Sequence, residues 1–253
     1  MSTSEKKLDG RIAVVTGASR GVGYQAALGL AQQGAHVIAL ARTVGGLEEL
    51  DDEIQAAGGS ATLVPVDLKD YDAIDRLGAS IHERWGKLDI LLGNAGVLGV
   101  VTPLPHLKPS VFDDVMAANV TANYRLIRSL DPLLRESDAG RALFVTSGAS
   151  RSCRPFVGPY AASKAALEAM VKSYAAEMQK SPLRVNLVDP GTLRTGMRAQ
   201  YAPGEDPNTV TEAKEIVPTL VNLLSSQLKR TGDIFSFPQN SWLSDQAGMF
   251  EEN

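Results

Sequence analysis

Three side chains in the middle of the sequence have the types and spacing of a proton-transfer site. Ser147 follows a short apolar run, residues 142–146, and Tyr160 and Lys164 stand four residues apart in a stretch rich in Ala, Leu, Met and Lys. That run predicts a strand, and the later composition and periodicity predict a helix. Because residues four apart on a helix are neighbours on one face, the Lys164 ammonium is expected to lie beside the Tyr160 phenol.

This pairing would change the acidity of the phenol. A free phenol has a pKa near ~10, too high for proton exchange at neutral pH, and a nearby cation favours the phenolate. Lowering the pKa of Tyr160 by roughly three units requires about 4 kcal/mol, which one close ammonium and a cofactor's positive ring would supply. Ser147 would then hold the reacting oxygen by a hydrogen bond. Alone, Tyr-x-x-x-Lys also fits a packed tyrosine beside a solvated lysine. Motifs elsewhere in the chain are needed to distinguish a proton-transfer site from this structural pair.

Short apolar runs alternate with amphipathic stretches along most of the chain. This alternation implies a parallel sheet covered by helices on both faces, and Pro65 suggests that the third strand lies near an edge. The strands are expected at residues 11–16, 36–41, 61–66, 88–92, 142–146, 184–188 and 234–237, and the helices at 24–33, 47–57, 71–85, 110–134 and 160–180.

Ligands of such a sheet bind beyond the carboxyl ends of its strands. Four residues that follow predicted strands fall at this edge: Gly17, Asn94, Ser147 and Gly191. The glycine-rich turn 17–23 joins the first strand to a helix, and glycines there let the backbone approach a pyrophosphate at the positive helix start. By itself the turn also fits an ordinary tight connection.

Taken in chain order, these motifs resemble the short single-domain branch of the short-chain dehydrogenase/reductase family. The resemblance covers residues 8–237 and rests on Thr-Gly-x-x-x-Gly-x-Gly, Asn94-Ala95-Gly96, Ser147, Tyr160-x-x-x-Lys164 and Pro190-Gly191. It implies a single α/β domain, 1–253, with a Rossmann-type doubly wound, mostly parallel sheet. It also implies an oxidoreductase that interconverts a carbonyl and a secondary alcohol by hydride transfer, with Tyr160 as acid or base.

The resemblance assigns further site residues. Asn119 matches the family's fourth catalytic residue and would order a water that connects Lys164 to solvent, although a solvent-facing or capping amide is the alternative. Asp67-Leu68 would contact the adenine, 94–96 the adenosine ribose and 190–195 the nicotinamide carboxamide. The implied cofactor contacts are Gly17, Ser19, Arg20, Gly21, Val22, Gly23, Arg42, Asp67, Leu68, Asn94, Ala95, Gly96, Tyr160, Lys164, Pro190, Gly191, Leu193 and Thr195.

The end of the second strand indicates which nicotinamide cofactor is used. An acidic residue there accepts hydrogen bonds from the ribose hydroxyls but repels a 2′-phosphate. This chain has Ala41 at that position, followed by Arg42, and it has Arg20 in the glycine turn. Two cations with no opposing carboxylate predict NADP(H), unless both arginines are simply solvated.

The substrate is expected between the loop 97–104, the segment 150–159 and an irregular stretch, 192–211, that is the expected flap. Arg151 and Arg154 would meet a substrate carboxylate or face water, and we expect water. The pocket should be largely apolar, since six apolar side chains belong to these segments: Leu98, Val100, Val101, Phe156, Val157 and Met197.

Composition limits the remaining possibilities. The chain has 253 residues, a net charge of -4 and one cysteine, Cys153; we therefore expect one domain, no nucleic-acid surface and no internal disulfide. Its three histidines show no metal-ligand spacing, and it has no apolar export or membrane segment, which favours the cytoplasm.

The family that the chain resembles commonly forms homodimers or homotetramers. A regulator that senses dinucleotides on the same fold, and a sugar-nucleotide epimerase, are the competing interpretations.

Overall fold

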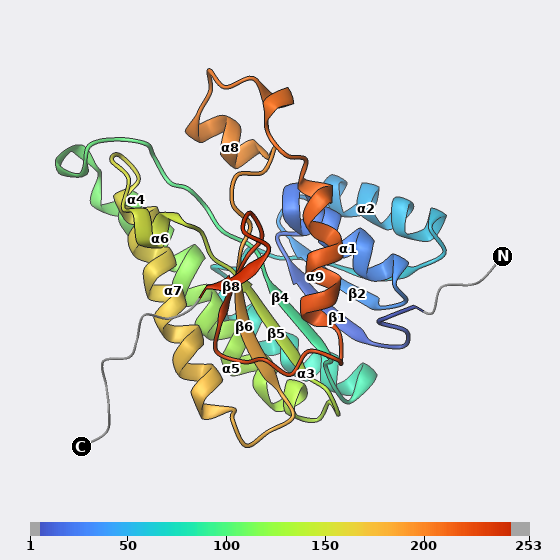
Figure 1. Cartoon of the computed structure of the whole chain (residues 1–253). Coiled ribbons are helices and arrows are strands. Elements are labelled where there is room, and N and C mark those ends of the chain that lie inside the picture. The colour runs from blue at the N-terminus through green and yellow to red at the C-terminus, as the bar shows by residue number, and fades with distance from the viewer. Residues whose placement is uncertain (1–5, 244–253) are drawn as a thin grey trace, which may run out of the picture.

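The structure, a computed structural model that describes residues 6–243, is built around one twisted sheet with helices on both sides (Figure 1). The ends of the expected domain, residues 1–5 and 244–253, lie outside the described residues. The eight strands follow the order β3-β2-β1-β4-β5-β6-β7-β8. They are β1 (Ile12–Thr16), β2 (His36–Ala41), β3 (Ser60–Pro65), β4 (Ile90–Gly93), β5 (Arg141–Val145), β6 (Arg184–Asp189), β7 (Ile234–Ser236) and β8 (Ser241–Leu243).

The predicted parallel α/β sheet is confirmed. Strands β1 to β7 pair in parallel, and β1, β4 and β5 are buried along their whole length, as their nearly continuous apolar sequences require. Pro65 ends β3, which is an edge strand as expected. No sequence pattern indicated β8, which pairs antiparallel with β7 and is too short for a periodic pattern.

Two groups of helices cover the faces of the sheet. Helices α1, α2 and α9 contribute to one apolar core, and α3, α5 and α7 contribute to the other (Figure 1). No helix within residues 6–243 is long and apolar enough to cross a membrane. The α-helices are α1 (Gly21–Gln32), α2 (Val44–Ala56), α3 (Tyr71–Trp85), α4 (Pro109–Met116), α5 (Ala122–Arg135), α6 (Ala149–Ser152), α7 (Gly158–Glu177), α8 (Gly196–Tyr201) and α9 (Val217–Leu224).

The predicted helix at 110–134 is interrupted. A π-helical turn, Ala117–Thr121, separates α4 from α5 and contains Asn119. A π turn inserts an extra residue into an otherwise continuous helix and is frequent at functional sites. Hydrophobic periodicity did not indicate it, because the polar Asn119 lies in the buried part of the turn.

The segment 192–211 projects beyond the carboxyl ends of the strands (Figure 1). It is partly regular, with α8 and a short 3-10 turn, Pro207–Thr209, and not an irregular loop throughout. A β-bridge between Arg194 and Glu212, together with the ion pair of their side chains, closes its base. The segment is thus anchored at both ends next to the sheet edge.

Candidate active site

The carboxyl ends of β1, β4, β5 and β6 are neighbours, and hydrogen bonds connect the first two. The Thr16 hydroxyl accepts from the backbone N–H groups of Asn94 and Ala95, each at 3.0 Å, and Asn94 Nδ2 donates to the Thr16 carbonyl at 2.9 Å. Thr16 therefore fixes the 94–96 segment against the glycine turn. The sequence motifs did not point to Thr16, although a hydroxyl residue at the end of an otherwise apolar strand is a signal that a sequence can give.

The glycine turn leaves no room for side chains on its inner side. A Cβ added at Gly23 would lie 2.3 Å from the Gly17 carbonyl oxygen and 2.4 Å from Asn94 Nδ2. Gly17 and Gly21 have φ values of +68° and +59°, which other residues rarely adopt. The helix start has no side-chain cap, so its N–H groups are available to an anion, and the turn fits the phosphates of a dinucleotide.

The side chains of the turn point to different surroundings. Val22 packs against the apolar core, and Ser19 lies against Gly46 at the start of α2, where an added Cβ would come within 2.8 Å of the Ser19 carbonyl oxygen. Arg20 is exposed. This contact brings the first turn of α2, which carries no acidic residue, next to the glycine turn.

Arg42 is exposed after β2, but it does have a carboxylate nearby. Its Nη1 lies 3.8 Å from Asp67 Oδ2, in a solvent-exposed pair, which corrects the expectation that no carboxylate opposes this cation. Exposed pairs of this kind contribute little energy, so Arg42 remains free to reorient toward an anion. Leu68, beside Asp67, is partly buried against the second core.

Lys164 lies inside the protein at the end of β5. It is 3% exposed, and its ammonium donates to the Val145 carbonyl at 2.8 Å and lies 5.8 Å from the centroid of the Tyr160 ring. A Cβ at Gly96 would be 3.5 Å from this ammonium, so the dinucleotide segment and the lysine are adjacent. Burial lowers the pKa of Lys164 to about 8, against the opposing influence of the Glu168 charge.

The structure brings Ser147 and Tyr160 together. Their side chains share a hydrogen bond, which lowers the pKa of the phenol. The net shift is nevertheless upward, because burial, reinforced by the negative charge of Asp189, raises the pKa of Tyr160 above its usual value. The expected lowering also requires the positive charge of a cofactor; the protein's own groups shift the pKa of Tyr160 upward, since the Lys164 ammonium donates to a backbone carbonyl and the half-buried phenol loses hydration.

Asn119 connects the dinucleotide segment to α7. Its Oδ1 accepts from the Val97 N–H at 2.8 Å, while Nδ2 donates to the Val97 carbonyl at 3.0 Å and to Ser163 Oγ at 2.9 Å. The side chain is fully buried, so it is neither solvent-facing nor a helix cap. Its amide fixes the loop after Gly96 to the helix that carries Tyr160 and Lys164.

The 190–195 segment lies over the glycine turn. Gly191 adopts φ +65° and packs against Pro238, and an added Cβ at Gly21 would come within 3.4 Å of the Thr195 methyl group. The Thr195 hydroxyl caps α8 by accepting from the Arg198 N–H at 3.2 Å, and Leu193 is buried, whereas Pro190 is partly exposed.

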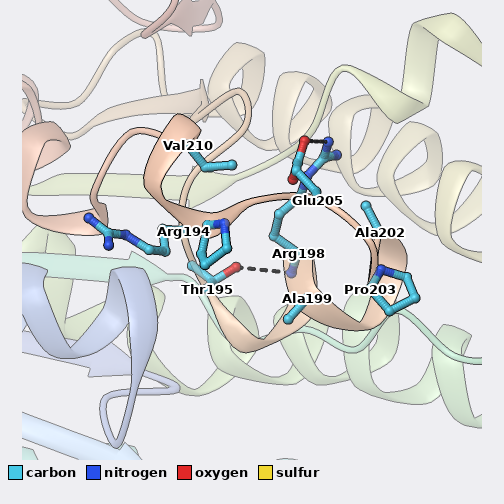
Figure 2. A pocket seen from close by; sticks show the side chains of 9 residues that line it. Arg194, Thr195, Arg198, Ala199, Ala202, Pro203, Glu205 and Val210 are labelled. Carbon is cyan, nitrogen blue, oxygen red and sulfur yellow. Dashed lines mark hydrogen bonds and ion pairs between the residues drawn. The ribbon is translucent and has the colours of Figure 1, made fainter.

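A cavity of about 360 Å³ opens inside the 192–211 segment, beside α8 (Figure 2). The side chains of Arg198 and Glu205 form two hydrogen bonds at its edge, both 2.6 Å long. Gln200 donates to the Gly99 carbonyl at 2.8 Å, so α8 meets the 97–104 loop. The cavity is lined by Arg194, Thr195, Arg198, Ala199, Ala202, Pro203, Glu205, Pro207 and Val210.

The loop 97–104 and the segment 150–159 are in contact, since the Thr102 N–H donates to the Phe156 carbonyl at 3.0 Å. Their apolar side chains differ in exposure: Val100, Val101 and Phe156 are exposed, Met197 in the 192–211 segment is partly exposed, and Leu98 and Val157 are buried. Arg154 is exposed. Arg151 is also exposed, as expected, but its guanidinium pairs with Glu168 and Asp189 and is not free in water.

Comparison with known proteins agrees with this geometry. A family model described as short chain dehydrogenase matches residues 11–206. The uncharacterized oxidoreductase YciK of Escherichia coli K12 is 39% identical over 232 residues, which cover 90% of this chain and 92% of YciK. A short chain dehydrogenase of Shigella flexneri, crystallised with NADP, superimposes with a TM-score of 0.88 at 38% identity, covering 92% of this chain and 99% of that one. An Escherichia coli CFT073 protein crystallised with NADPH gives a TM-score of 0.87 at 38% identity, with coverages of 92% and 98%.

The buried ammonium of Lys164 predicts a specific pH dependence of stability. Its folded-state pKa of about 8 lies below the ordinary 10.5. Between these two pH values the unfolded chain holds a proton on this lysine that the folded chain has lost. The folded state therefore becomes more stable as the pH rises. Relative to Lys164→Met, the unfolding free energy of the wild type should rise by about 3 kcal/mol between pH 7 and pH 10.5.

Urea unfolding of both proteins across this pH range measures the difference. Lys108→Met, which removes an exposed lysine at the start of α4, is the control. If the unfolding free energies of the wild type and of Lys164→Met differ by the same amount at every pH, the assignment of a costly buried ammonium is contradicted.

Proposed function

The chain belongs to the short-chain dehydrogenase family and is an oxidoreductase of that family, and we propose that it uses NADP(H) to interconvert a carbonyl and a secondary alcohol. The observation that supports this most is the hydrogen-bonded Ser147–Tyr160 pair next to the buried Lys164. These groups stand at the same sheet edge as a glycine turn that fits phosphates. A proton-exchanging hydroxyl beside a dinucleotide site is what carbonyl reduction requires.

NADP(H) would be held by the turn 17–23, the 94–96 segment, Lys164 and the 190–195 segment. Two related proteins were crystallised with NADP and NADPH, and Arg20 and Arg42 supply cations where a 2′-phosphate would lie, with Ala41 in place of an acidic residue. When bound, the nicotinamide ring supplies or accepts the hydride. Asp67-Leu68 would contact the adenine.

In the reduction direction, Tyr160 would donate its phenolic proton to the carbonyl oxygen as that oxygen becomes an alkoxide. In the protein alone the raised pKa keeps the phenol protonated, which is the form that a proton donor needs, and a positive charge beside the phenol would lower this pKa and ease the release of the proton. Ser147 would donate a hydrogen bond to the same oxygen. The Lys164 ammonium would stabilise the phenolate form of Tyr160 once its proton is transferred. In alcohol oxidation, the phenolate takes the proton back.

Asn119 would complete the site by holding the loop after Gly96 against α7, and a water near it would return protons to Lys164. We further propose that the 192–211 segment is the substrate flap and that exposed apolar side chains on the neighbouring loops favour an apolar carbonyl compound. The proposal includes a homodimer or homotetramer, a single domain and a cytoplasmic location. The exposed, unpaired thiol of Cys153 is compatible with a reducing compartment.

Tyr160→Phe removes the phenolic hydroxyl and keeps the ring. Because general acid catalysis contributes about 10²–10⁴-fold, kcat for reduction of 9,10-phenanthrenequinone or 2,3-butanedione should fall by about that factor. The affinity for NADPH should be unchanged, since the ring is retained. Loss of NADPH absorbance measures turnover, and fluorescence titration measures binding.

Tyr124→Phe, at an exposed tyrosine on α5, is the control. If Tyr160→Phe keeps its turnover, Tyr160 is not the general acid.

Arg42→Ala should weaken NADPH binding by about 10- to 100-fold, because charged hydrogen bonds contribute about 1.5–3 kcal/mol each. NADH lacks the phosphate, so its affinity should change little, and Arg20→Ala should behave similarly. Fluorescence titration with both cofactors measures the two affinities. Equal losses for NADPH and NADH, or a tenfold preference of the wild type for NADH, would refute the NADP(H) assignment.

A further inference from the structure

A second polar cluster lies between α6, α7 and the end of β6. Arg151 on α6 donates from Nη1 to Glu168 Oε1 at 2.9 Å and from Nη2 to Asp189 Oδ2. The same Glu168 oxygen lies 2.6 Å from Thr146 Oγ1 and 2.7 Å from Ser150 Oγ. One guanidinium thus joins two carboxylates that belong to different elements of the fold.

The two carboxylates depend on this cation. The side chains of Glu168 and Asp189 are only 13% and 10% exposed, and enclosed carboxylates are costly unless they are paired and hydrogen-bonded. Arg151 is 39% exposed and reaches them from the surface. A planar guanidinium presents several N–H groups in one fork and can bind two carboxylates together, which the single ammonium of a lysine does less well.

Each partner of Arg151 belongs to a segment that carries a site residue. Glu168 stands one helical turn after Lys164 on α7. Asp189 Oδ1 accepts from the Gly191 N–H at 3.0 Å, at the start of the segment that lies over the glycine turn. The guanidinium therefore connects the helix of the lysine with the loop after β6.

The third connection leads to the serine. Arg151 lies on the short helix α6, directly after Ser147. Ser150 Oγ, 3.2 Å from Arg151 Nη1, is also 2.8 Å from the Ser147 carbonyl oxygen. The Ala149 N–H donates to Ser147 Oγ at 3.2 Å. Movement of α6 would consequently move the Ser147 hydroxyl relative to Tyr160.

We propose that Arg151 is a positioning residue of the proposed reaction: by bridging Glu168 and Asp189 it holds α6, and with it Ser147, in register with Tyr160 and Lys164. This inference rests on the proposed function. The guanidinium of Arg151 is used within the protein, by Glu168 and Asp189, so Arg151 would act through Ser147 and not as a recognition group for an anionic substrate.

Arg151→Met tests this role, with NADPH and 9,10-phenanthrenequinone as probes. Loss of one charged, oriented contact should lower kcat by about 10- to 100-fold, while the affinity for NADPH, measured by fluorescence titration, should stay within about twofold of the wild type. Arg151→Lys keeps a cation without the fork and should show an intermediate kcat. Full turnover by either variant would overturn the proposal, and Arg151→Lys decides the question if Arg151→Met does not fold.

Arg230→Met is the matched control. Arg230 pairs with Asp233 at 2.5 Å near the opposite end of β6 and lies over the Trp242 ring, so its loss removes an ion pair and a cation–π contact away from the site and should leave kcat unchanged. An equal fall of kcat in Arg230→Met and Arg151→Met would show general destabilisation and overturn the positioning role.

Hydrogen exchange separates this proposal from the proposed function, because it requires no turnover. The backbone amides of residues 147–152 should exchange about tenfold faster in Arg151→Met than in the wild type, which corresponds to the loss of a contact worth about 1.4 kcal/mol, and not in Arg230→Met. Unchanged exchange would overturn the positioning role even if the wild type is active. A wild type that fails to oxidise NADPH with the quinone, but shows the exchange difference, would instead refute the proposed reaction while supporting the bridge.

Discussion

The central constraint of this molecule is a lysine ammonium buried at the end of a central strand. Lys164 has lost nearly all contact with water, and its Nζ is held by the Val145 carbonyl. Such a charge costs stability, as its lowered pKa indicates. This chain keeps the Lys164 ammonium close to the Tyr160 phenol and the Ser147 hydroxyl at a cost in folding stability. The surrounding contacts hold these three groups together.

The fold supplies those contacts at one edge of the sheet. Parallel strands end together there, and short polar links connect the ends: Thr16 joins β1 to the segment after β4, and Asn119 joins that segment to α7. Arg151 adds the connection among α6, α7 and the end of β6. Each link uses a polar side chain whose partners are backbone groups, a hydroxyl or carboxylates, so the loops of the site are fixed by hydrogen bonds as well as by apolar packing.

Local sequence patterns predicted most of the fold, because each strand and helix has a marked periodicity of its own; β2 and α3 have the predicted bounds. Local geometry also made two site features predictable: the glycines of the turn 17–23 and the four-residue spacing of Tyr160 and Lys164. What was missed depends on long-range contacts. The π turn at Asn119, the pairing of β8, and the bridge from Arg151 to Glu168 and Asp189 involve partners that no local pattern specifies. The upward shift of the Tyr160 pKa in the protein alone likewise depends on tertiary burial, which outweighs the hydrogen bond from Ser147.

The most direct test of the account is a spectroscopic titration of Tyr160, taken as the difference in phenolate absorbance between the wild type and Tyr160→Phe. We predict a pKa above the ordinary 10.0 in the protein alone, as burial requires, and a lower pKa once NADP⁺ is bound, when a second positive charge joins Lys164 beside the phenol. The same pKa with and without NADP⁺ would contradict the claim that Tyr160 is the proton-exchanging group of this site.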